Sequence, residues 1–354
     1  MISVVIPAFN AGRFIKRTID SVLAQTYKDY EIIVVDDGST DNTGELVKSY
    51  GSKVRYIYQP NAGDGPARST GIKAAKGEWL AFLDHDDEWL PEKLRLQMAL
   101  LNKHPDLRWC AGNFYNQSGS RKAPAVEPAA ISRALGGSDY SENYFTAVLR
   151  TGCNFMTSTM VIHREVFEQA GVFDSCWMRC ADIDMWWRIT YRFPKIGCLP
   201  QPLAILHVDV QDVTSTRLRL LTKRGEETRR LVAQHLKLAR ERGMLQEFVP
   251  LAFSVLKKAL LTTIFQGFGS DSREIVTQFK ELFGWHWRIA VYLATIFPKA
   301  TSSAAKAVAY TWHKLGLERD ISRRWINLVR DETGARSYPG DVGLDKTSQR
   351  KGKE

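Results

Sequence analysis

The sequence lacks a cysteine framework and long apolar runs, and both absences limit what the protein can be. Its five cysteines are odd in number and include no CxxC pair. Cys176 and Cys180 have no second Cys or His pair that would complete a zinc site, so we expect free thiols in a reducing cytoplasm. No stretch of 18 or more uncharged apolar residues occurs, which predicts no transmembrane helix. We also expect no signal peptide, because the first residues already read as a strand.

Basic residues outnumber acidic ones only toward the C-terminus. Residues 1–216 carry 23 Lys and Arg against 25 Asp and Glu, whereas residues 217–354 carry 26 against 14. The formal net charge of +10 therefore belongs to the second region. A basic excess confined to one region indicates an anionic membrane surface or a nucleic acid as its neighbour. Because no nucleic-acid-binding motif accompanies the charge, we expect no nucleic-acid partner.

Strand and helix signals alternate over the first hundred residues. The run "EIIVV" within residues 30–38 is typical of a parallel strand that is buried on both faces. The alternation predicts a Rossmann-like, doubly wound and mostly parallel α/β sheet. We expect strands within residues 2–9, 30–38, 53–60 and 78–84, and helices within residues 11–27, 39–50, 65–77 and 91–104.

The rest of the chain contains three regions that differ in composition and periodicity. Residues 116–144 are rich in Ser, Gly, Ala and Pro, which predicts a long loop. Strand and helix signals return between residues 153 and 205, and from about residue 217 only helical periodicity remains. We therefore predict an α/β domain over residues 1–216, a basic helical extension over residues 217–338 and a disordered tail over residues 339–354.

Acidic side chains gather where the second and fourth predicted strands end. In an open parallel sheet, ligands bind outside the carboxyl ends of the strands. Asp37 follows the second strand and can accept hydrogen bonds from a base or ribose, or cap the next helix. Asp84 and Asp86 follow the fourth strand and can hold one divalent cation together with diphosphate oxygens. The alternative for this pair is a solvated acidic turn before Pro91.

Four segments together resemble family 2 glycosyltransferases of the GT-A fold, over roughly residues 1–215. The resemblance implies inverting transfer of a sugar from a nucleotide-diphosphate donor, usually UDP-linked, with Mn²⁺ or Mg²⁺ as cofactor. It also implies a nucleotide-sugar half over about residues 1–110 and an acceptor half over about residues 111–216. The segments read "VVIPAFN", "SVLAQTYKDYEIIVVDDGSTDNT", "NAGDGPARSTGIKAAKGEWLAFLDHDDEWLPEKL" and "VFEQAGVFD" followed by "ADIDMWWRI".

The resemblance implies which residues bind the nucleotide. Pro7 and Phe9 match the nucleotide wall after the first strand, and Asp37 matches the carboxylate that reads the base. Arg68 matches a basic residue near the nucleotide. Asp84 belongs to the DxD pair that faces the nucleotide and its cation.

The resemblance also implies a metal site. Asp84 and Asp86 match the DxD pair, and Asp86 is the more direct metal ligand of the two. Many relatives place a His after the next strand, where it completes the metal site. His207 is one match for that position and Asp209 is the other, and a structural histidine is an equal alternative.

For the catalytic base, the resemblance implies Asp182. This residue matches the Asp of the family's Glu-Asp motif, but Ala181 replaces the Glu, so Asp184 remains a rival. Inversion needs one base that deprotonates an acceptor hydroxyl as it attacks C1, and a carboxylate can do this. The transition state should resemble an oxocarbenium ion, and the metal offsets charge on the departing diphosphate. Without the other motifs, a helix N-cap would be the favoured role of Asp182.

The predicted function is therefore an inverting glycosyltransferase that acts on a saccharide or lipid-linked acceptor in bacterial surface polysaccharide synthesis. One alternative is a non-catalytic relative that binds nucleotide sugar or polysaccharide, which only Ala181 favours. A second is a nucleotidyltransferase, which leaves the Asp182 segment without a role.

The extension carries aromatic residues beside basic ones in apolar helices. Such helices suit an anionic membrane interface, or they pack on the catalytic domain as a helical subdomain. The first reading predicts a cytoplasmic protein held peripherally on the cytoplasmic face of the membrane. The aromatic residues are Trp285, Trp287, Tyr292, Tyr310 and Trp312.

Overall fold

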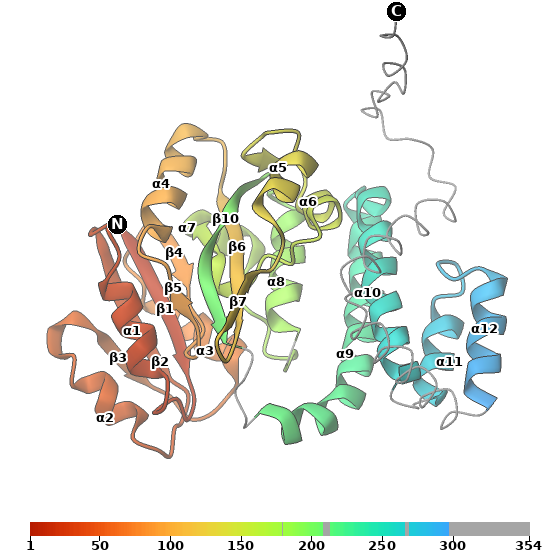
Figure 1. The fold of residues 1–354 in the computed structure, drawn as a ribbon, viewed down its shortest axis with the longest axis horizontal. Helices are drawn as coiled ribbons and strands as arrows, with labels where there is room; N and C mark the ends of the chain where they lie inside the picture. Colours follow the sequence, from red (N-terminus) through yellow and green to blue (C-terminus); the bar gives the residue numbers. More distant parts are fainter. Residues whose placement is uncertain (179, 208–212, 266–268, 297–354) are drawn as a thin grey trace, which may run out of the picture.

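The structure, a computed structural model, describes residues 1–178, 180–207, 213–265 and 269–296 (Figure 1). Asp209, Tyr310, Trp312 and the tail that we predict to be disordered lie outside these residues. All five cysteines are free, as the sequence predicts, and only Cys176 is exposed.

A mixed sheet forms the centre of the α/β domain, with strand order β3-β2-β1-β4-β9-β6-β10-β5. Its first four strands are parallel to one another, and every residue of β1 is buried. This burial on both faces explains the uninterrupted apolar runs in the sequence. The four strands are β1 (Ile2–Ala8), β2 (Tyr30–Asp36), β3 (Arg55–Tyr58) and β4 (Trp79–Phe82).

The second half of the sheet contains the antiparallel pairings. β9 is antiparallel to both β4 and β6, β6 and β10 are parallel, and β5 is antiparallel to β10. The predicted α/β fold with a mostly parallel sheet is confirmed, and the single short strand β9 joins its two halves. These strands are β5 (Glu88–Trp89), β6 (Trp109–Ser118), β9 (Val161–His163) and β10 (Ile196–His207).

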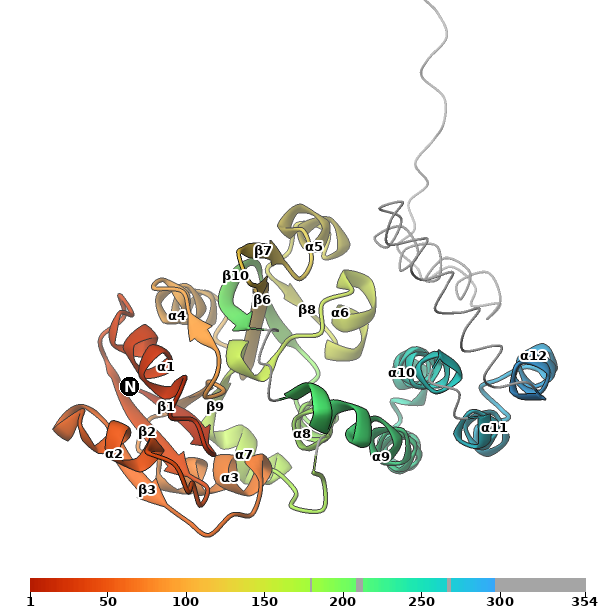
Figure 2. The same ribbon diagram turned by 60° about the horizontal axis from the view of Figure 1, so that its bottom comes forward.

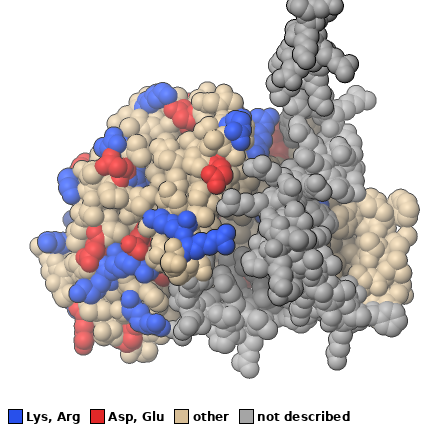
Figure 3. Space-filling model, in the orientation of Figure 1, with Lys and Arg blue, Asp and Glu red and all other residues tan. Residues whose placement is uncertain are grey.

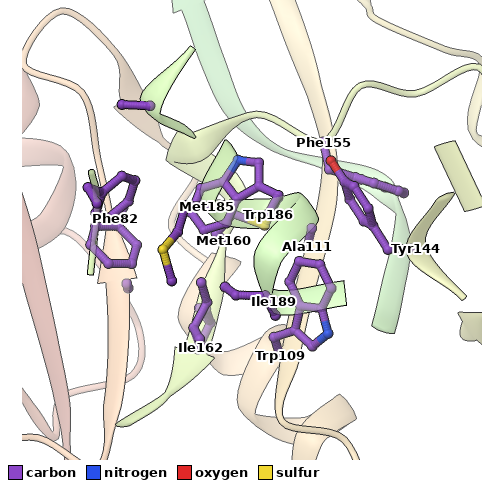
Figure 4. Packing of buried hydrophobic residues seen from close by; sticks show 14 of the residues in the cluster. Phe82, Trp109, Ala111, Tyr144, Phe155, Met160, Ile162, Met185, Trp186 and Ile189 are labelled. Atoms are coloured by element: carbon purple, nitrogen blue, oxygen red, sulfur yellow. The ribbon is translucent and has the colours of Figure 1, made fainter. Parts of the chain in front are cut away.

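Helices cover both faces of the sheet (Figure 2). The helices α1 and α2 lie together on one face, and α3, α7 and α8 lie together on the other. Between sheet and helices lies an apolar core, in which Phe82, Met160 and Trp186 pack together and Trp109 lies toward Tyr144 (Figure 4). The helices are α1 (Ile15–Leu23), α2 (Thr43–Lys48), α3 (Asp64–Ala74), α4 (Lys93–Lys103), α6 (Tyr144–Thr151), α7 (Arg164–Ala170) and α8 (Ala181–Thr190).

The prediction of a long loop over residues 116–144 was wrong. This segment contains the end of β6 and three further elements: β7 (Arg121–Pro124), α5 (Pro128–Ala134) and β8 (Tyr140–Ser141). The segment is tied down by the buried amide of Asn113, whose Nδ2 donates to the carbonyls of Val126 and Pro200 at 2.6 and 3.0 Å. Only Ile131 of α5 is buried, so the helix has too few apolar residues to show in the sequence.

The helical prediction for the C-terminal region is confirmed where the structure describes it. The elements are α9 (Val213–Glu241), α10 (Leu245–Phe265), α11 (Gly269–Gln278) and α12 (Trp285–Ile296). The expected domain boundary after residue 216 falls inside α9. Phe248 of α10 packs against Phe145 of α6 and Trp187 of α8, so the extension shares a core with the α/β domain. No helix within the described residues is long and apolar enough to cross a bilayer.

Candidate active site

The carboxyl ends of β1, β2 and β4 meet at one edge of the sheet. The backbone N–H of Asp37 donates to the carbonyl of Ala8 at 2.8 Å, and that of Leu83 donates to Val5 at 3.1 Å. The acidic clusters that follow β2 and β4 therefore lie on either side of the end of β1. This is the place where open α/β sheets bind ligands.

Phe9 stands at this edge with 40% of its surface exposed, next to the buried Pro7. The following residue, Asn10, has a positive φ of 48°, which is uncommon for a residue other than glycine. Its side-chain oxygen accepts from the N–H of Thr40 at 2.9 Å, and its own N–H donates to Ser39 Oγ at 3.0 Å. These bonds lock the loop after β1 to the loop after β2, which keeps the Phe9 ring at the site.

Asp37 is 3% exposed and holds the loop that leads into α3. One carboxylate oxygen accepts from Gln59 Nε2 at 2.6 Å and from the N–H of Ala62 at 3.0 Å, and the other accepts from the N–H of Gly63 at 2.7 Å. Gly38, with φ +80°, makes the tight turn beside it, since a Cβ there would lie 2.8 Å from the backbone N of Asn61. The residue that we predict to read the base is thus held rigidly at the carboxyl end of β2.

Arg68 and Asp84 form an ion pair below this edge. Arg68 is 6% exposed and donates to Asp84 Oδ1 at 2.6 Å, with its Cζ 5.6 Å from the ring centroid of Phe173. Burial alone would lower the pKa of Arg68, but Asp84 and Asp64 overcome this effect and raise it. Two residues that the resemblance implies for nucleotide binding therefore lie together as a partly buried ion pair.

Asp86 lies in the same loop and is half-buried. Burial raises its pKa, and repulsion from Asp84 adds to the effect, against the opposing charge of His85. A cation bound beside Asp86 would relieve this repulsion. Asp84 and Asp86 are hard oxygen donors of the kind that Mg²⁺ and Mn²⁺ prefer, so this pair fits the implied metal.

His207 is paired with Glu88 rather than with Asp84 or Asp86. Its Nε2 lies 2.6 Å from Glu88 Oε1, and the same oxygen lies 3.1 Å from Arg17 Nε. Among the residues that the structure describes, no three His, Cys, Asp or Glu side chains are grouped to hold a metal ion. The predicted ligands that come together are Asp84 and Asp86, while His207 is engaged with Glu88.

Asp182 lies in the first turn of α8, half-buried. One oxygen accepts from the N–H of Ile183 at 2.8 Å and the other from Thr157 Oγ1 at 3.3 Å. Burial raises the pKa of Asp182, the charge of Arg68 opposes this, and Asp84 adds to it. A carboxylate with a raised pKa is a better match for proton transfer near neutral pH than an ordinary one.

Asp184, the rival base, is completely buried. Its oxygens lie 2.7 Å from Arg188 Nε and 3.1 Å from His235 Nε2. Burial alone would raise the pKa of Asp184, but these two partners lower it. Asp184 therefore joins α8 to α9, and Asp182 is the carboxylate on the side of Arg68.

Ala181, which replaces the Glu of the family motif, is packed against the first turn of α3. A Cβ on Gly65 would lie 3.2 Å from the Cβ of Ala181 and 3.6 Å from the Cβ of Phe173. The small residues at 65 and 181 let the helix that carries Arg68 approach the helix that carries Asp182.

Sequence reasoning missed two groups at this site. Asp87 is 5% exposed and its Oδ2 lies 2.5 Å from Ser158 Oγ; burial, with repulsion from Asp84, raises its pKa well above the usual range. The second group is the buried turn η2 (Thr157–Thr159). Three hydroxyl residues in a row just before an apolar strand, "TSTMVI", are the signal that could have drawn attention to it.

Comparison with known proteins identifies the family. A family model described as glycosyl transferase family 2 matches residues 3–170. An uncharacterised glycosyltransferase of Rickettsia prowazekii is 32% identical over 226 residues, which cover 62% of this chain and 68% of that protein. The chain belongs to glycosyltransferase family 2. A second relative, an uncharacterised glycosyltransferase of Rickettsia typhi, is 35% identical over 193 residues, which cover 53% of this chain and 58% of that protein.

The fold of this family 2 glycosyltransferase is also found among solved structures. Residues 1–349 of S. aureus TarS, solved in complex with UDP-GlcNAc, superpose with a TM-score of 0.60 at 17% identity, over 89% of this chain and 92% of that one. The same TarS region solved with UDP gives a TM-score of 0.56 at 18% identity. The GT-A type of the fold, with helices after the α/β domain, is thereby confirmed.

Proposed function

We propose that this glycosyltransferase moves a sugar from a nucleotide-diphosphate donor, a UDP-sugar, to a hydroxyl of a saccharide or lipid-linked acceptor, with inversion at C1. The observation that carries the proposal is that adjacent residues hydrogen-bond to Asp182 and to Asp84, the partner of Arg68, which places the predicted base beside this pair. The complexes of the similarly folded TarS with UDP and UDP-GlcNAc support a uridine donor.

On the donor side, Pro7, Phe9 and Asp37 form the wall of the nucleotide site. Arg68 supplies a fixed positive charge near the diphosphate, and its burial strengthens its interaction with an anionic ligand. Mn²⁺ or Mg²⁺, held by Asp86 and Asp84, would offset the negative charge that develops on the departing diphosphate. The donor and acceptor halves of residues 1–110 and 111–216 meet between α3 and α8.

On the acceptor side, Asp182 acts as the general base. Its carboxylate takes the proton of the acceptor hydroxyl while that oxygen forms the new bond to C1. The bond from C1 to the diphosphate oxygen breaks, and the nucleoside diphosphate leaves with that electron pair. The packing of Ala181 on Gly65 offers a structural reason for the absence of the family's Glu at this position.

We also propose an anionic membrane surface as partner, on the cytoplasmic face, where lipid-linked acceptors for surface polysaccharide would lie. Large apolar side chains on α12 are 48–73% exposed at positions that repeat every three to four residues, and α12 contains no acidic residue. On the view of the α/β domain in Figure 3, by contrast, basic and acidic side chains are mixed. The exposed apolar side chains of α12 are Trp285, Ile289, Tyr292, Leu293 and Ile296.

A panel of nucleotide sugars tests the proposed function. The full chain is incubated with each donor, with and without Mn²⁺, and release of UDP or GDP is measured beside an Asp182→Asn blank. We expect UDP release that Mn²⁺ increases and that the blank lacks. Release of pyrophosphate, or no nucleoside diphosphate from any donor, would contradict a glycosyltransferase of this type.

A further inference from the structure

Three consecutive hydroxyl residues form the buried turn η2 between the two acidic groups of the site. Thr157, Ser158 and Thr159 are each at most 1% exposed. A buried hydroxyl costs free energy unless it is hydrogen-bonded, so the partner of each side chain indicates what it does. The turn leads directly into β9, the strand between β4 and β6, and is therefore mounted on the rigid sheet.

Thr157 faces the acceptor side. Its Oγ1 donates to Asp182 Oδ2 at 3.3 Å, while the N–H of Ile183 donates to Oδ1 at 2.8 Å. Each oxygen of the carboxylate is thus held by one donor. A base must present its oxygen in one orientation to the hydroxyl that it deprotonates, because misplacement by even an ångström costs rate.

Ser158 faces the donor side. Its Oγ accepts from the N–H of Asp84 at 3.2 Å and bonds to Asp87 Oδ2 at 2.5 Å. Its carbonyl also accepts from Trp89 Nε1 at 2.7 Å. Ser158 therefore holds the loop that carries Asp86 at Asp84 and Asp87, and holds the following strand at Trp89.

The hydroxyl of Thr159 bonds to neither acidic group of the site. Its Oγ1 donates to the carbonyl of Met156 at 2.8 Å, within the turn itself. The three neighbours therefore differ in their partners while sharing burial and position.

We propose that η2 positions both halves of the active site, with Thr157 orienting the Asp182 carboxylate and Ser158 holding the loop of Asp84 and Asp86. This inference rests on the proposed function, in which Asp182 is the base and the loop binds the donor. Because the two side chains belong to adjacent residues on one turn, the base and the donor loop keep a fixed spacing.

The test separates kcat from the donor KM in single variants of the full chain. The donor is the nucleotide sugar that releases most nucleoside diphosphate in the panel. Thr157→Val should lower kcat about tenfold with the donor KM unchanged, the equivalent of about 1.4 kcal/mol for one hydrogen bond to a charged group. Thr157→Ser, which keeps the hydroxyl, should restore kcat.

Two matched variants complete the set. Ser158→Ala should raise the donor KM about tenfold and change kcat less, because it frees the donor loop. Thr159→Val removes only a bond inside the turn and should change neither constant. Equal losses of kcat in Thr157→Val and Thr159→Val, or an unchanged Thr157→Val, would overturn the proposal.

Melting temperatures show whether each variant folds. If Thr157→Val does not fold, Thr157→Cys replaces it, because a thiol is a weak donor. Its kcat should then fall below that of Thr157→Ser, and equal values would overturn the proposal. An active Asp182→Asn would refute the proposed base, whereas an inactive Asp182→Asn with a normal Thr157→Val would refute only the role of the turn.

Discussion

Oδ1 of Asp184 and Nε2 of His235 lie 3.1 Å apart, and both side chains are completely buried between α8 and α9. The imidazole also packs edge-on against Trp187, with ring centroids 5.0 Å apart. Burial lowers the pKa of His235 against the pull of Asp184. This pair fastens the helix of the proposed base to the C-terminal extension.

Loss of the imidazole should therefore destabilise the whole fold. We expect His235→Ala to lower the free energy of unfolding by about 3–5 kcal/mol, because it leaves a buried carboxylate short of a partner and opens a cavity. Chemical denaturation measures this change. Lys237→Ala on the same helix, where the side chain is 81% exposed, should stay within about 0.5 kcal/mol of the parent, and equal losses in both would contradict the role of the pair.

The two neighbouring carboxylates of α8 should fail in different ways. Asp182→Asn should keep the melting temperature and the donor affinity while turnover falls by about two orders of magnitude or more, since an amide cannot take the acceptor proton. Asp184→Asn should lower the melting temperature and leave activity in the fraction that remains folded. A stable, inactive Asp184→Asn beside an active Asp182→Asn would identify Asp184 as the base in place of Asp182.

The metal site can be tested through Asp86. Because Ser158 holds the loop through Asp84 and Asp87, Asp86→Ala should fold normally yet lose activation by Mn²⁺ and bind donor more weakly. Titration of activity with Mn²⁺ measures both effects. His207→Gln is the matched comparison: with His207 engaged by Glu88, the Mn²⁺ dependence should stay the same, and a weakened dependence would make His207 a ligand.

Lys93 gives the fold a pH dependence of its own. Its amine is completely buried, 3.9 Å from the centre of the Trp89 ring and 2.7 Å from Gln97 Oε1, and burial lowers its pKa from 10.5 to about 7. Between these two values the unfolded chain binds a proton that the folded chain does not. The stability that depends on this group is therefore complete above pH 10.5 and is lost as the pH falls toward 7.

Lys93→Met should consequently stabilise the protein by about 1–2 kcal/mol at pH 7, and the gain should shrink as the pH approaches 10. Thermal melts at several pH values measure the difference. Lys103→Met, at an exposed position of the same helix, should shift stability by less than about 1 kcal/mol without this trend. A gain from Lys93→Met that is independent of pH would refute the lowered pKa.

Membrane association can be measured by co-sedimentation of the full chain with vesicles. We expect binding to anionic vesicles that weakens at high salt without vanishing, because the apolar contribution of α12 is not screened. Tyr292→Glu should reduce binding, whereas Tyr58→Glu should not, although both tyrosines are about equally exposed at 59% and 60%. No binding to anionic vesicles at low salt would favour a helical subdomain without a membrane role.

The strands β1 to β4 and the helices α1 to α4 were predictable because their signals are local, whereas the two-residue strand β5 was not predicted. The apolar run of β2 and the polar residues at the start of α2 are each visible in a few adjacent residues. The segment 116–144 was missed because Asn113 anchors it through long-range hydrogen bonds. The same reason hid the η2 turn, whose partners Asp182 and Asp87 lie 25 and 71 residues away from Thr157 and Ser158.

The choice between Asp182 and Asp184 also needed the fold. Residues two apart on a helix point about 200° away from each other, so one of them faces the site when the other faces away. The sequence shows that two carboxylates begin the helix. Only the positions of Arg68 and His235 show which carboxylate faces the site and which faces α9.

The shared core of α6, α8 and α10 restricts how this enzyme can exchange parts during evolution. A recombination event near residue 216 would pair α8 with a foreign extension and separate Asp184 from His235. In the hybrid, the buried carboxylate of Asp184 would keep Arg188 but lose His235, and Trp187 would lose the cover of Phe248, so we expect the hybrid to be less stable. Recombination is therefore tolerated best where α8 is transferred together with α9 and α10, the two helices that supply His235 and Phe248.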